Sequence, residues 1–319
     1  LAAETRRRPQ EARGGGGYDR LGDLERVFGR AACQLSDRPW SARVVGGYAW
    51  LEDRPGRAIG GGVDGEGWLA LALERRWRRG ELTLEAGGHA QVGGGPVVPR
   101  LRVRARHALD ARFEVWARAT AFEVVPETPL LLTLGVRERV GVGAAIELPG
   151  GLRLRASIDG EHHHDRGGAT LGLGAVGDLR LSRGLDLGGS NRLEVYASGR
   201  ALARSAAETF GPELSPLDAR GLTPADILPT EFATAGLGVA IARGDLAAVP
   251  NPALGLRYFV DAWAGWQWPL DQPAYRVEAG LGARLFGPDE LHLRGYFGNV
   301  LGGLEDVQAG LTLGYRWRL

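Results

Sequence analysis

Hydrophobic and polar residues alternate along most of this chain with a period of two. The pattern is clearest at the C-terminal end, where alternate positions are apolar and the positions between them are polar or glycine. The apolar set is Val307, Ala309, Leu311, Leu313, Tyr315, Trp317 and Leu319. Because successive side chains of a strand point to opposite faces, this segment predicts a β-strand with one face suited to hydrocarbon and one suited to water.

The same alternation recurs in about fourteen segments from residue 41 onward. They are 41–52, 66–78, 80–92, 98–109, 111–123, 138–148, 151–162, 168–182, 190–203, 232–243, 253–268, 274–286, 290–299 and 305–319. Most of them exceed the roughly 9–11 residues that a tilted strand needs to cross a bilayer. The alternation therefore predicts an all-β fold whose strands span a membrane.

The connections between these segments alternate between short and long. Tight turns fall at 79–80, 107–110, 149–151 and 287–289, and longer loops fall at 53–65, 93–97, 124–137, 163–167 and 204–231. Outer-membrane barrels have short periplasmic turns and longer extracellular loops. We therefore predict a transmembrane antiparallel up-and-down β-barrel of about 14–16 strands, with both termini on the periplasmic side. The apolar stretch 130–136 leaves room for a further strand.

A soluble β-sandwich or solenoid is the main alternative, because sheets with one wet face alternate too. Nearly every segment carries the pattern, however, and the polar faces hold rows of arginine that the core of a sandwich would not bury. No run of 18 or more apolar residues is present, so the sequence indicates no transmembrane helix.

Residues 1–40 depart from the alternation. The stretches 6–9 and 14–17 are rich in arginine and glycine, as in a linker. Apolar residues from 18 to 35 recur at helical spacing, with charged residues opposite them. We therefore expect residues 1–40 to form a linker and a short N-terminal periplasmic helical segment, and residues 41–319 to form the barrel. The chain starts without a signal peptide, so we expect it to be the C-terminal part of a longer precursor.

Charge and cysteine content narrow the function classes. The formal net charge is +1, which gives nucleic-acid binding no support. All 39 basic residues are arginine, which says little about chemistry. Cys33 is the only cysteine, so an internal disulfide and a thiolate metal cluster are excluded, and its place on the expected helix predicts a buried side chain. No cofactor is expected.

Two short motifs resemble ligand sites but fit structural roles better. Residues 172–177 read Gly-Leu-Gly-Ala-Val-Gly, which indicates a dinucleotide site only when a helix follows. Here residues 178–182 continue the strand alternation, so small residues on a barrel wall are the better interpretation. The run 162–165, His-His-His-Asp, could bind a metal, although a solvated extracellular loop is the favoured interpretation. No Ser, His and Asp constellation indicates catalysis.

Charged residues on the polar faces form the candidate functional site, since a barrel would place them in its lumen. The predicted lumen residues are Arg100, Arg102, Arg104, Arg106, Arg112, Glu114, Arg118, Arg153, Arg155, Asp159, Glu194, Tyr196, Arg276, Glu278, Arg284 and Arg294. Ion pairing between strands is one role for the charges, and selection of the solute that crosses is the other. Tyr196 could stack on a sugar ring or merely fill space.

The loop 204–231 is too long to be passive in a compact structure. It contains Ser215-Pro216-Leu217-Asp218 and Thr223-Pro224-Ala225-Asp226. Each motif offers a hydroxyl at the N-cap, proline at the first helical position and an acid in the first turn. We predict one or two helical turns that fold over or into the pore as a gating loop, with Ser215, Asp218, Thr223 and Asp226 as its key residues. A plain surface loop is the alternative.

The C-terminal third also carries resemblances. Residues 312–319 resemble the terminal-strand signal by which bacterial outer-membrane barrels are recognised for insertion. Residues 264–270 (Ala-Gly-Trp-Gln-Trp-Pro-Leu) and 280–291 (Gly-Leu-Gly-Ala-Arg-Leu-Phe-Gly-Pro-Asp-Glu-Leu) resemble the porin domain of the PelB family, which exports the Pel exopolysaccharide. Relatives with the same plan export cellulose or poly-N-acetylglucosamine. The resemblance implies a barrel of roughly sixteen strands, an upstream tetratricopeptide-repeat region and a PelC-like periplasmic lipoprotein ring as partner.

Pattern and resemblance together favour a channel in the bacterial outer membrane rather than an enzyme. We expect it to contact outer-membrane lipids and to pass an exopolysaccharide from the periplasm to the cell surface through a charged, loop-gated lumen. A general or anion-preferring diffusion porin is one alternative, and a phage or adhesion receptor that uses the long loops is another. A barrel enzyme would need a polar catalytic cluster near one rim, and the sequence shows none.

Overall fold

The computed structural model describes residues 11–21, 24–37, 39–53, 65–92, 97–124, 134–244, 255–284, 289–300 and 307–318. Its strands are β1 (Glu11–Leu21), β2 (Leu24–Asp37), β3 (Trp40–Asp53), β4 (Gly65–Trp77), β5 (Gly80–Val92), β6 (Val98–Ala108), β7 (Phe113–Val124), β8 (Gly135–Leu148), β9 (Leu152–Asp165), β10 (Thr170–Gly188), β11 (Asn191–Ala206), β12 (Glu231–Arg243), β13 (Leu256–Trp268), β14 (Gln272–Arg284), β15 (Glu290–Gly298) and β16 (Gln308–Arg318). Short helical turns are η1 (Pro149–Gly151), η2 (Pro212–Leu214), α2 (Ser215–Asp218) and α3 (Pro224–Ile227).

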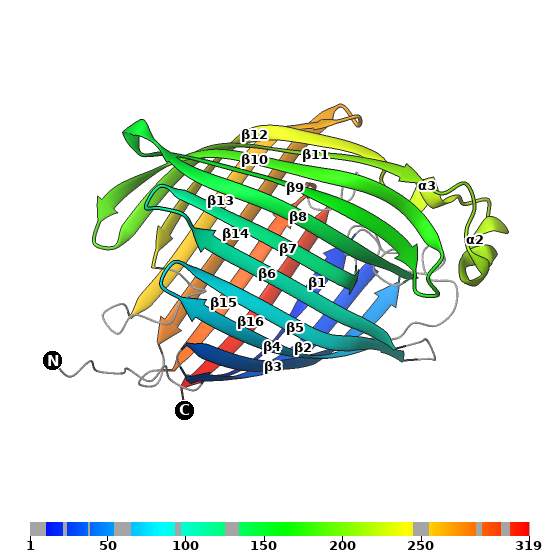
Figure 1. Cartoon of the computed structure of the whole chain (residues 1–319), viewed down its shortest axis with the longest axis horizontal. Coiled ribbons are helices and arrows are strands. Elements are labelled where there is room, and N and C mark those ends of the chain that lie inside the picture. The colour runs from blue at the N-terminus through cyan, green and yellow to red at the C-terminus, as the bar shows by residue number, and fades with distance from the viewer. Residues whose placement is uncertain are drawn as a thin grey trace.

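The sixteen strands close into one antiparallel barrel, because every strand pairs with its neighbours in sequence and β1 pairs with β16 (Figure 1). The predicted up-and-down transmembrane β-barrel is therefore confirmed. No helix in the described part of the chain is both long and apolar enough to cross a membrane.

The barrel begins earlier in the chain than the sequence pattern predicted. The helix expected over 18–35 is wrong, because this stretch forms part of β1 and most of β2, the two strands missing from the count of about fourteen. The alternation is broken there by Phe28, which faces the lumen under the guanidinium of Arg26, 5.0 Å from the ring centre. Gly17 makes room for this ring, since a Cβ there would lie 2.7 Å from Phe28 Cζ. Cys33, expected to be buried, is exposed.

The barrel has a turn end and a loop end. Strands are joined at the turn end by the short connections 78–79, 109–112, 149–151 and 189–190, and β1 begins there. The connections 207–230 and 299–307 belong to the loop end. Figure 1 shows α2 and α3 at the right. The predicted tight turns near 79, 109 and 150 thus lie together, and residues 287–288 fall outside the described residues.

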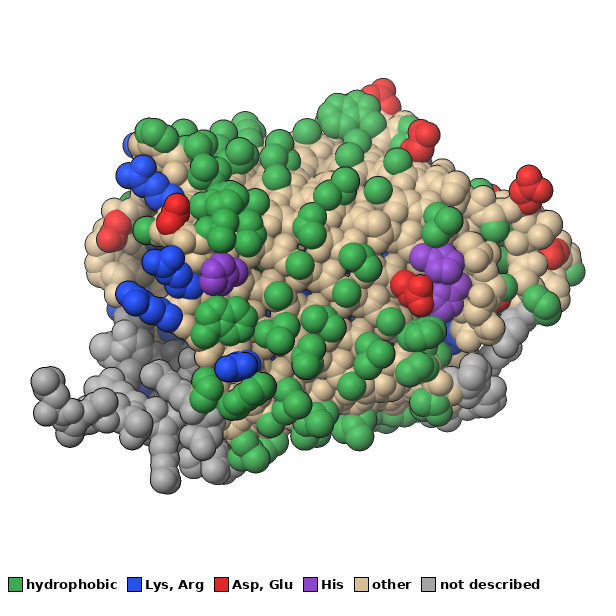
Figure 2. Space-filling model, in the orientation of Figure 1, with side chains coloured by type: hydrophobic (Ala, Val, Ile, Leu, Met, Phe, Trp, Pro, Cys, Tyr) green, Lys and Arg blue, Asp and Glu red, His purple; other side chains and the backbone are tan. Residues whose placement is uncertain are grey.

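The outer face of the barrel is apolar. Figure 2 shows hydrophobic side chains spread over the face in view, with arginines gathered towards the turn end. Large aromatic side chains lie exposed near both ends: Trp40 and Trp77 near the turn end, and Trp50 and Trp266 near the loop end. An apolar band between aromatic girdles is typical of a barrel in an outer membrane.

The pair β1–β16 is the seam that closes the barrel. The glycine run 14–17 of β1 lies opposite residues 312–315 of β16. On the inner side, Glu11 and Arg316 join an ion-pair cluster with Arg257 and Glu290, and all four side chains are almost fully buried. Arg316 lies 3.6 Å from Glu290 and 4.0 Å from Glu11. Backbone pairing and buried charges therefore hold the two ends of the barrel wall together.

The two short motifs lie within strands. The run 162–165 ends β9 and is not a solvated loop, because His163, His164 and Asp165 are buried. Among the described residues, no group of three or more His, Cys, Asp or Glu could hold a metal ion. Residues 172–177 lie inside β10. A Cβ at Gly172 would lie 2.4 Å from Leu228 Cδ2, so this glycine leaves space for Leu228 of the connection between β11 and β12.

Candidate functional site

Strand alternation places the predicted lumen residues on the inner face of the barrel, with one exception. On β6, for example, Leu101 and Val103 are exposed on the outer face, so the arginines between them face inward. The inward residues are Arg100, Arg102, Arg104 and Arg106 on β6, Glu114 and Arg118 on β7, Arg153, Arg155 and Asp159 on β9, Glu194 and Tyr196 on β11, Arg276, Glu278 and Arg284 on β14, and Arg294 on β15. Arg112 is the exception, since it lies exposed in the turn 109–112.

A continuous chain of ion pairs crosses the inner wall from β5 to β8. Arg100 lies 3.3 Å from Glu85, which is also 3.9 Å from Arg102. Arg102 donates to Glu123 at 3.0 Å. Glu123 accepts a second hydrogen bond from Arg137, also at 3.0 Å. Glu85 thus ties β5 to β6, and Glu123 of β7 bridges arginines of β6 and β8, which fixes these strands to one another on their inner side.

Glu161 on β9 is the centre of this charged wall near the loop end. It accepts hydrogen bonds from Arg137 at 3.1 Å, Arg139 Nε at 2.8 Å and Arg204 at 2.5 Å. The side chains of Glu161 and Arg204 are fully buried. His163 lies 3.4 Å from the same carboxylate. One buried carboxylate is therefore shared by arginines from β8 and β11.

Sequence reasoning missed several of these residues for identifiable reasons. Strand β7 carries a register shift between Thr120 and Glu123, which turns Glu123 inward although strict alternation would point it outward. Phe122, inside this shift, has a φ of 55°. Arg204 was assigned to the loop 204–231, whereas β11 continues to Ala206. A search for arginine and glutamate just beyond each strand end would have found this part of the wall.

Most of the remaining predicted residues form isolated ion pairs rather than an extended chain. Arg106 donates to Glu114 at 2.5 Å, and Arg118 Nε donates to Asp159 Oδ1 at 2.6 Å. The other pairs are Arg153 with Glu147 at 3.4 Å, Arg180 with Glu194 at 2.9 Å, Arg276 with Asp261 at 3.4 Å, and Arg294 with Glu278. Most of the predicted lumen charges are therefore paired within the wall.

Tyr196 is engaged on its hydroxyl and on its ring. The hydroxyl donates to Asp261 at 2.5 Å. The guanidinium of Arg180 lies 3.6 Å from the ring centre. The ring is thus covered by a cation, which leaves less of it open to a sugar than the sequence suggested.

Two of the predicted lumen arginines on the inner face differ from the other predicted residues. No carboxylate in the described part of the chain pairs with Arg104 or Arg155. Arg104 lies directly opposite Arg118 on the neighbouring strand, and Arg155 lies directly opposite Arg180. Like charges in opposed positions destabilise a sheet, so these sites are not explained by wall stability.

The start of the connection between β15 and β16 enters the lumen. Asn299 is clamped to the edge of β14, because its amide oxygen accepts from Tyr275 N–H at 2.9 Å and its amide group donates to Pro273 O at 2.9 Å. Val300 then packs on the inward side chains of Val176, Leu202, Phe232, Tyr196, Trp263 and Ala274. This apolar patch spans β10 to β14, so Val300 lies against the inner wall at a place that the sequence did not indicate.

A cavity of about 350 Å³ lies between Val300 and the charged wall. Its lining includes Trp116, Arg118, Arg155, Asp178, Arg180, Arg200, Trp263, Arg276 and Val300. The volume falls within the range of roughly 300–1,000 Å³ that is typical of small-molecule sites. The cavity brings together Arg118, Arg155 and Arg276 of the predicted site, whereas Arg284 and Arg294 are not part of its lining.

The connection 207–230 forms two helical turns at the loop end, α2 and α3 (Figure 1). Leu214, Leu217, Ile227 and Leu228 pack with Phe210 on Leu171 of β10, so the connection has an apolar core of its own. The predicted cap of α3 is present, because the amide and the hydroxyl of Thr223 both donate to Asp226 Oδ2 at 2.7 Å.

These hydrogen bonds from Thr223 hold the pKa of Asp226 below its usual range. Ser215 is not the cap of α2, since it lies inside the helix and its hydroxyl donates to Pro212 O at 2.9 Å. Asp218 lies in the first turn of α2.

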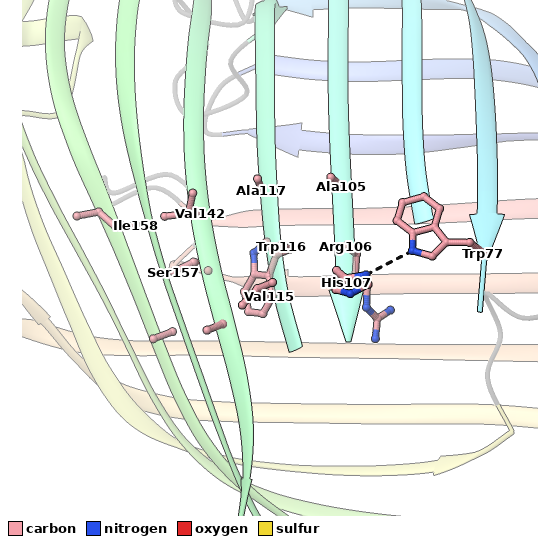
Figure 3. Close-up of a pocket in the computed structure, with 13 residues that line it drawn as sticks. Trp77, Ala105, Arg106, His107, Val115, Trp116, Ala117, Val142, Ser157 and Ile158 are labelled. Carbon is pink, nitrogen blue, oxygen red and sulfur yellow. Dashed lines mark hydrogen bonds between the residues drawn. The ribbon is translucent and has the colours of Figure 1, made fainter. Parts of the chain in front are cut away.

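A second hollow, of about 720 Å³, lies on the outside of the barrel. Figure 3 shows small and apolar side chains of β6 to β9 lining it, including Ala105, Ala117 and Val142. Near its turn end the indole of Trp77 donates to His107 Nδ1 at 3.3 Å. Its lining belongs to the membrane-facing surface, so this hollow is separate from the lumen.

Comparison with known proteins agrees with this geometry. The PelB C-terminal β-barrel domain matches residues 6–318. A solved structure described as a bacterial polysaccharide outer membrane secretin has a TM-score of 0.66 and 11% sequence identity, and the match covers 98% of this chain and 99% of that one. CdiB from Acinetobacter baumannii has a TM-score of 0.51 at 10% identity, with 97% of this chain and 60% of that chain covered. At such identities the structural matches show the fold alone. No curated protein matches the chain significantly.

The match to the family covers nearly the whole chain, and the fold is that of a transport channel rather than an enzyme. An apolar outer face between aromatic girdles, together with this fold, places the protein in the bacterial outer membrane. The chain belongs to the PelB C-terminal β-barrel family.

Proposed function

We propose that this barrel exports an exopolysaccharide from the periplasm to the cell surface through its charged lumen. The observation that supports this most directly is the cavity between Val300 and the charged wall. It offers polar and aromatic groups inside a closed barrel of a polysaccharide-export family. The channel acts passively: it lowers the barrier to crossing by supplying a hydrated path.

The connection 207–230 is proposed as the gate of this channel. Leu228 lies over Gly172, and Pro229 O accepts a hydrogen bond from Arg204 at 3.4 Å, so the end of the connection contacts the inner wall near the loop end. The apolar core of the connection and the Thr223–Asp226 cap give it a defined shape. A shaped segment that contacts the inner wall can restrict passage.

The turn end is proposed as the docking side for the upstream tetratricopeptide-repeat region and a PelC-like lipoprotein ring. Short turns face the periplasm in outer-membrane barrels. The exposed side chains of Arg78, Arg79 and Arg112 lie in turns at this end. If they contact the ring, changing all three to glutamate should abolish co-purification of a PelC-like ring with the barrel. Equal recovery of the ring would argue against this docking side.

Single-channel conductance in planar bilayers tests the export proposal. The intact barrel should conduct weakly, and replacing 207–230 by a short glycine-serine turn should raise the conductance several-fold. High conductance in the intact protein would instead indicate a diffusion porin, which the unpaired Arg104 and Arg155 would make anion-preferring. A protein that does not insert at all would contradict the membrane assignment.

A further inference from the structure

The hollow on the outside of the barrel lies at a defined depth in the membrane. Its lining residues belong to the halves of β4, β6, β7, β8 and β9 that are nearest the turn end. Short turns face the periplasm in outer-membrane barrels, so the hollow opens towards the periplasmic leaflet. Its volume of about 720 Å³ falls within the range of roughly 300–1,000 Å³ that is typical of small-molecule sites.

The hollow is apolar over most of its length. Among the described residues, the outward side chains that line it are apolar except for His107. Wall atoms around an empty apolar hollow lose their dispersion contacts on one side, so a group that fills it is favoured. At this depth in a bilayer, the apolar groups at hand are the acyl chains of lipids.

A tryptophan and a histidine stand at the turn end of the hollow (Figure 3). The indole of Trp77 donates to His107 Nδ1 at 3.3 Å. Gly80 leaves room for the indole, since a Cβ there would lie 2.7 Å from Trp77 Cε2. Because Nδ1 accepts, the proton of the neutral imidazole is on Nε2, which is a donor without a bonded acceptor in the described part of the chain.

A polar recess of about 360 Å³ adjoins the hollow at the same end, because Trp77 lines both. Arg78 also lines this recess. The guanidinium of Arg75 lies 5.3 Å from the ring centre of Trp40, which is another lining residue. Neither Arg75 nor Arg78 has a carboxylate partner in the part of the chain that the structure describes.

The acids nearby are already engaged. Glu74 of the recess pairs with Arg76, which also lies 3.5 Å from Glu81. Asp110, in the turn 109–112, accepts hydrogen bonds from two backbone amides of that turn, at 2.6 and 2.7 Å. The two arginines without a carboxylate partner are therefore available to an anion from outside the chain.

We propose that the hollow and the recess together bind one anionic phospholipid of the periplasmic leaflet. An acyl chain fills the hollow, the phosphate lies against Arg75 and Arg78, and His107 supplies a further donor. An anionic head joined to an apolar tail is the chemistry that matches both parts of the site. The site lies outside the lumen, so it goes beyond the export function and does not depend on it.

Native mass spectrometry of the purified chain in detergent tests the charge of the ligand. The chain is titrated with phosphatidylglycerol and, separately, with phosphatidylcholine of the same acyl chains. Phosphatidylglycerol should bind more tightly, and Arg75→Gln should weaken its binding about fivefold, as expected for one arginine near an anionic lipid. Arg192→Gln is the control, because Arg192 is exposed at the turn end of β11 and lines neither the hollow nor the recess.

Filling the hollow tests the place of the acyl chain. Ala117 lines the hollow and is exposed, so Ala117→Phe puts a ring there without moving the sheet, and should weaken binding of both lipids about tenfold. Ala86→Phe makes the same change at an exposed position of β5 outside the hollow and should leave lipid binding unchanged. Both variants should keep the single-channel conductance of the parent protein, which shows that the barrel is intact.

The site is wrong if the parent protein binds the two lipids equally, or if Ala117→Phe and Ala86→Phe bind lipid alike. A dimer in detergent that Ala117→Phe dissociates would assign the hollow to a second copy of the chain and would also overturn the proposal. None of these results bears on export, which is tested by conductance through the lumen.

Discussion

The inner wall of β5 to β9 and the inner wall of β10 to β14 are built from the same kind of alternating strand and both carry ion pairs, but the second also carries an apolar patch. The first carries arginines and glutamates joined through Glu85, Glu123 and Glu161. The second carries an apolar patch that includes Val176, Phe232 and Trp263. A water-filled lumen tolerates the first surface and disfavours the second.

Each surface is stabilised in the way that its chemistry requires. Most of the arginines need carboxylates and receive them from neighbouring strands, so most of the charged wall is satisfied within the barrel sheet. The apolar patch needs a cover, and Val300 supplies one from a connection. The comparison indicates that ion pairs connect the strands of the first wall, whereas apolar contacts hold Val300 of the connection between β15 and β16 against the second.

The largest expected effect comes from breaking the charged wall at its centre. Glu161→Gln leaves the guanidinium groups of Arg137, Arg139 and Arg204 without their shared carboxylate. Removing one partner from a buried ion pair costs about 3–5 kcal/mol of the free energy of unfolding. Urea unfolding of the barrel in lipid vesicles measures this loss.

Glu278→Gln is the matched control for that change. Its partner Arg294 has a side chain that is 64% exposed, so the pair should contribute only about 0–1 kcal/mol. Equal losses for the two variants would mean that burial does not distinguish the two pairs.

Breaking the apolar surface should have the next largest effect. Val300→Asp places a charge on the apolar patch and should release the start of the connection, at a cost of about 3 kcal/mol in the free energy of unfolding. Single-channel conductance should rise at the same time because the lumen widens. Val300→Ile keeps the apolar contact and should leave the conductance low. An unchanged conductance in Val300→Asp would show that Val300 does not restrict the lumen.

The clamp that carries Val300 can be removed without touching the patch. Asn299→Ala leaves Tyr275 N–H and Pro273 O without their side-chain partner, which should cost about 2 kcal/mol. We expect noisier currents, since Val300 is then held less firmly. If the currents stay as quiet as those of the parent protein, the patch alone fixes the connection.

The smallest expected effect lies at the gate. Thr223→Ala removes the hydroxyl from the cap of α3 and should speed amide hydrogen exchange at Leu228 about fivefold. The amide of Leu228 donates to Pro224 O at 2.9 Å. Ser215→Ala is the control. The Ser215 hydroxyl donates to Pro212 O within the preceding turn, so its removal should leave exchange at Leu228 unchanged.

The same cap has a defined pH dependence. The pKa of Asp226 is lowered in the folded loop, so its stabilisation is complete at neutral pH and is lost only as the pH falls below the usual range of an aspartate. Exchange at Leu228, corrected for intrinsic rates, should therefore stay constant down to that range and then rise. A rise near neutral pH would point to a different group.

Most of the fold could be predicted from the sequence because a strand between lipid and water must alternate. The prediction failed at β2, where Phe28 faces the lumen and creates a helical spacing by chance, and at β1, whose glycines carry no pattern. Both failures share a cause. Inward apolar residues and glycines are allowed where the side chains of neighbouring strands accommodate them, and the sequence of one strand does not show which side chains lie beside it.

Strand alternation predicted which of these side chains face inward, but not how they pair with one another. The alternation of the strands places Arg100, Arg118 and Arg155 on the inner face, as the structure does. Glu123 was missed because a bulge turns its side chain inward. Val300 was missed for another reason. Its partners lie on β10 to β14, far from it in sequence, so no local pattern marks it.

The pairing of β1 with β16 also has a kinetic consequence. Glu11 lies opposite Arg318, so the wall joins the two ends of the described chain. Each later strand can pair with the strand that precedes it in the sequence. The pairing of β1 with β16, in contrast, can form only when the last strand is in place. The entropic cost of closing a loop grows with its length, which makes this pairing the slowest to form. Until it forms, β1 exposes an unpaired edge whose glycines offer little side chain to protect it, so assembly of the barrel is most vulnerable to wrong pairing just before it ends.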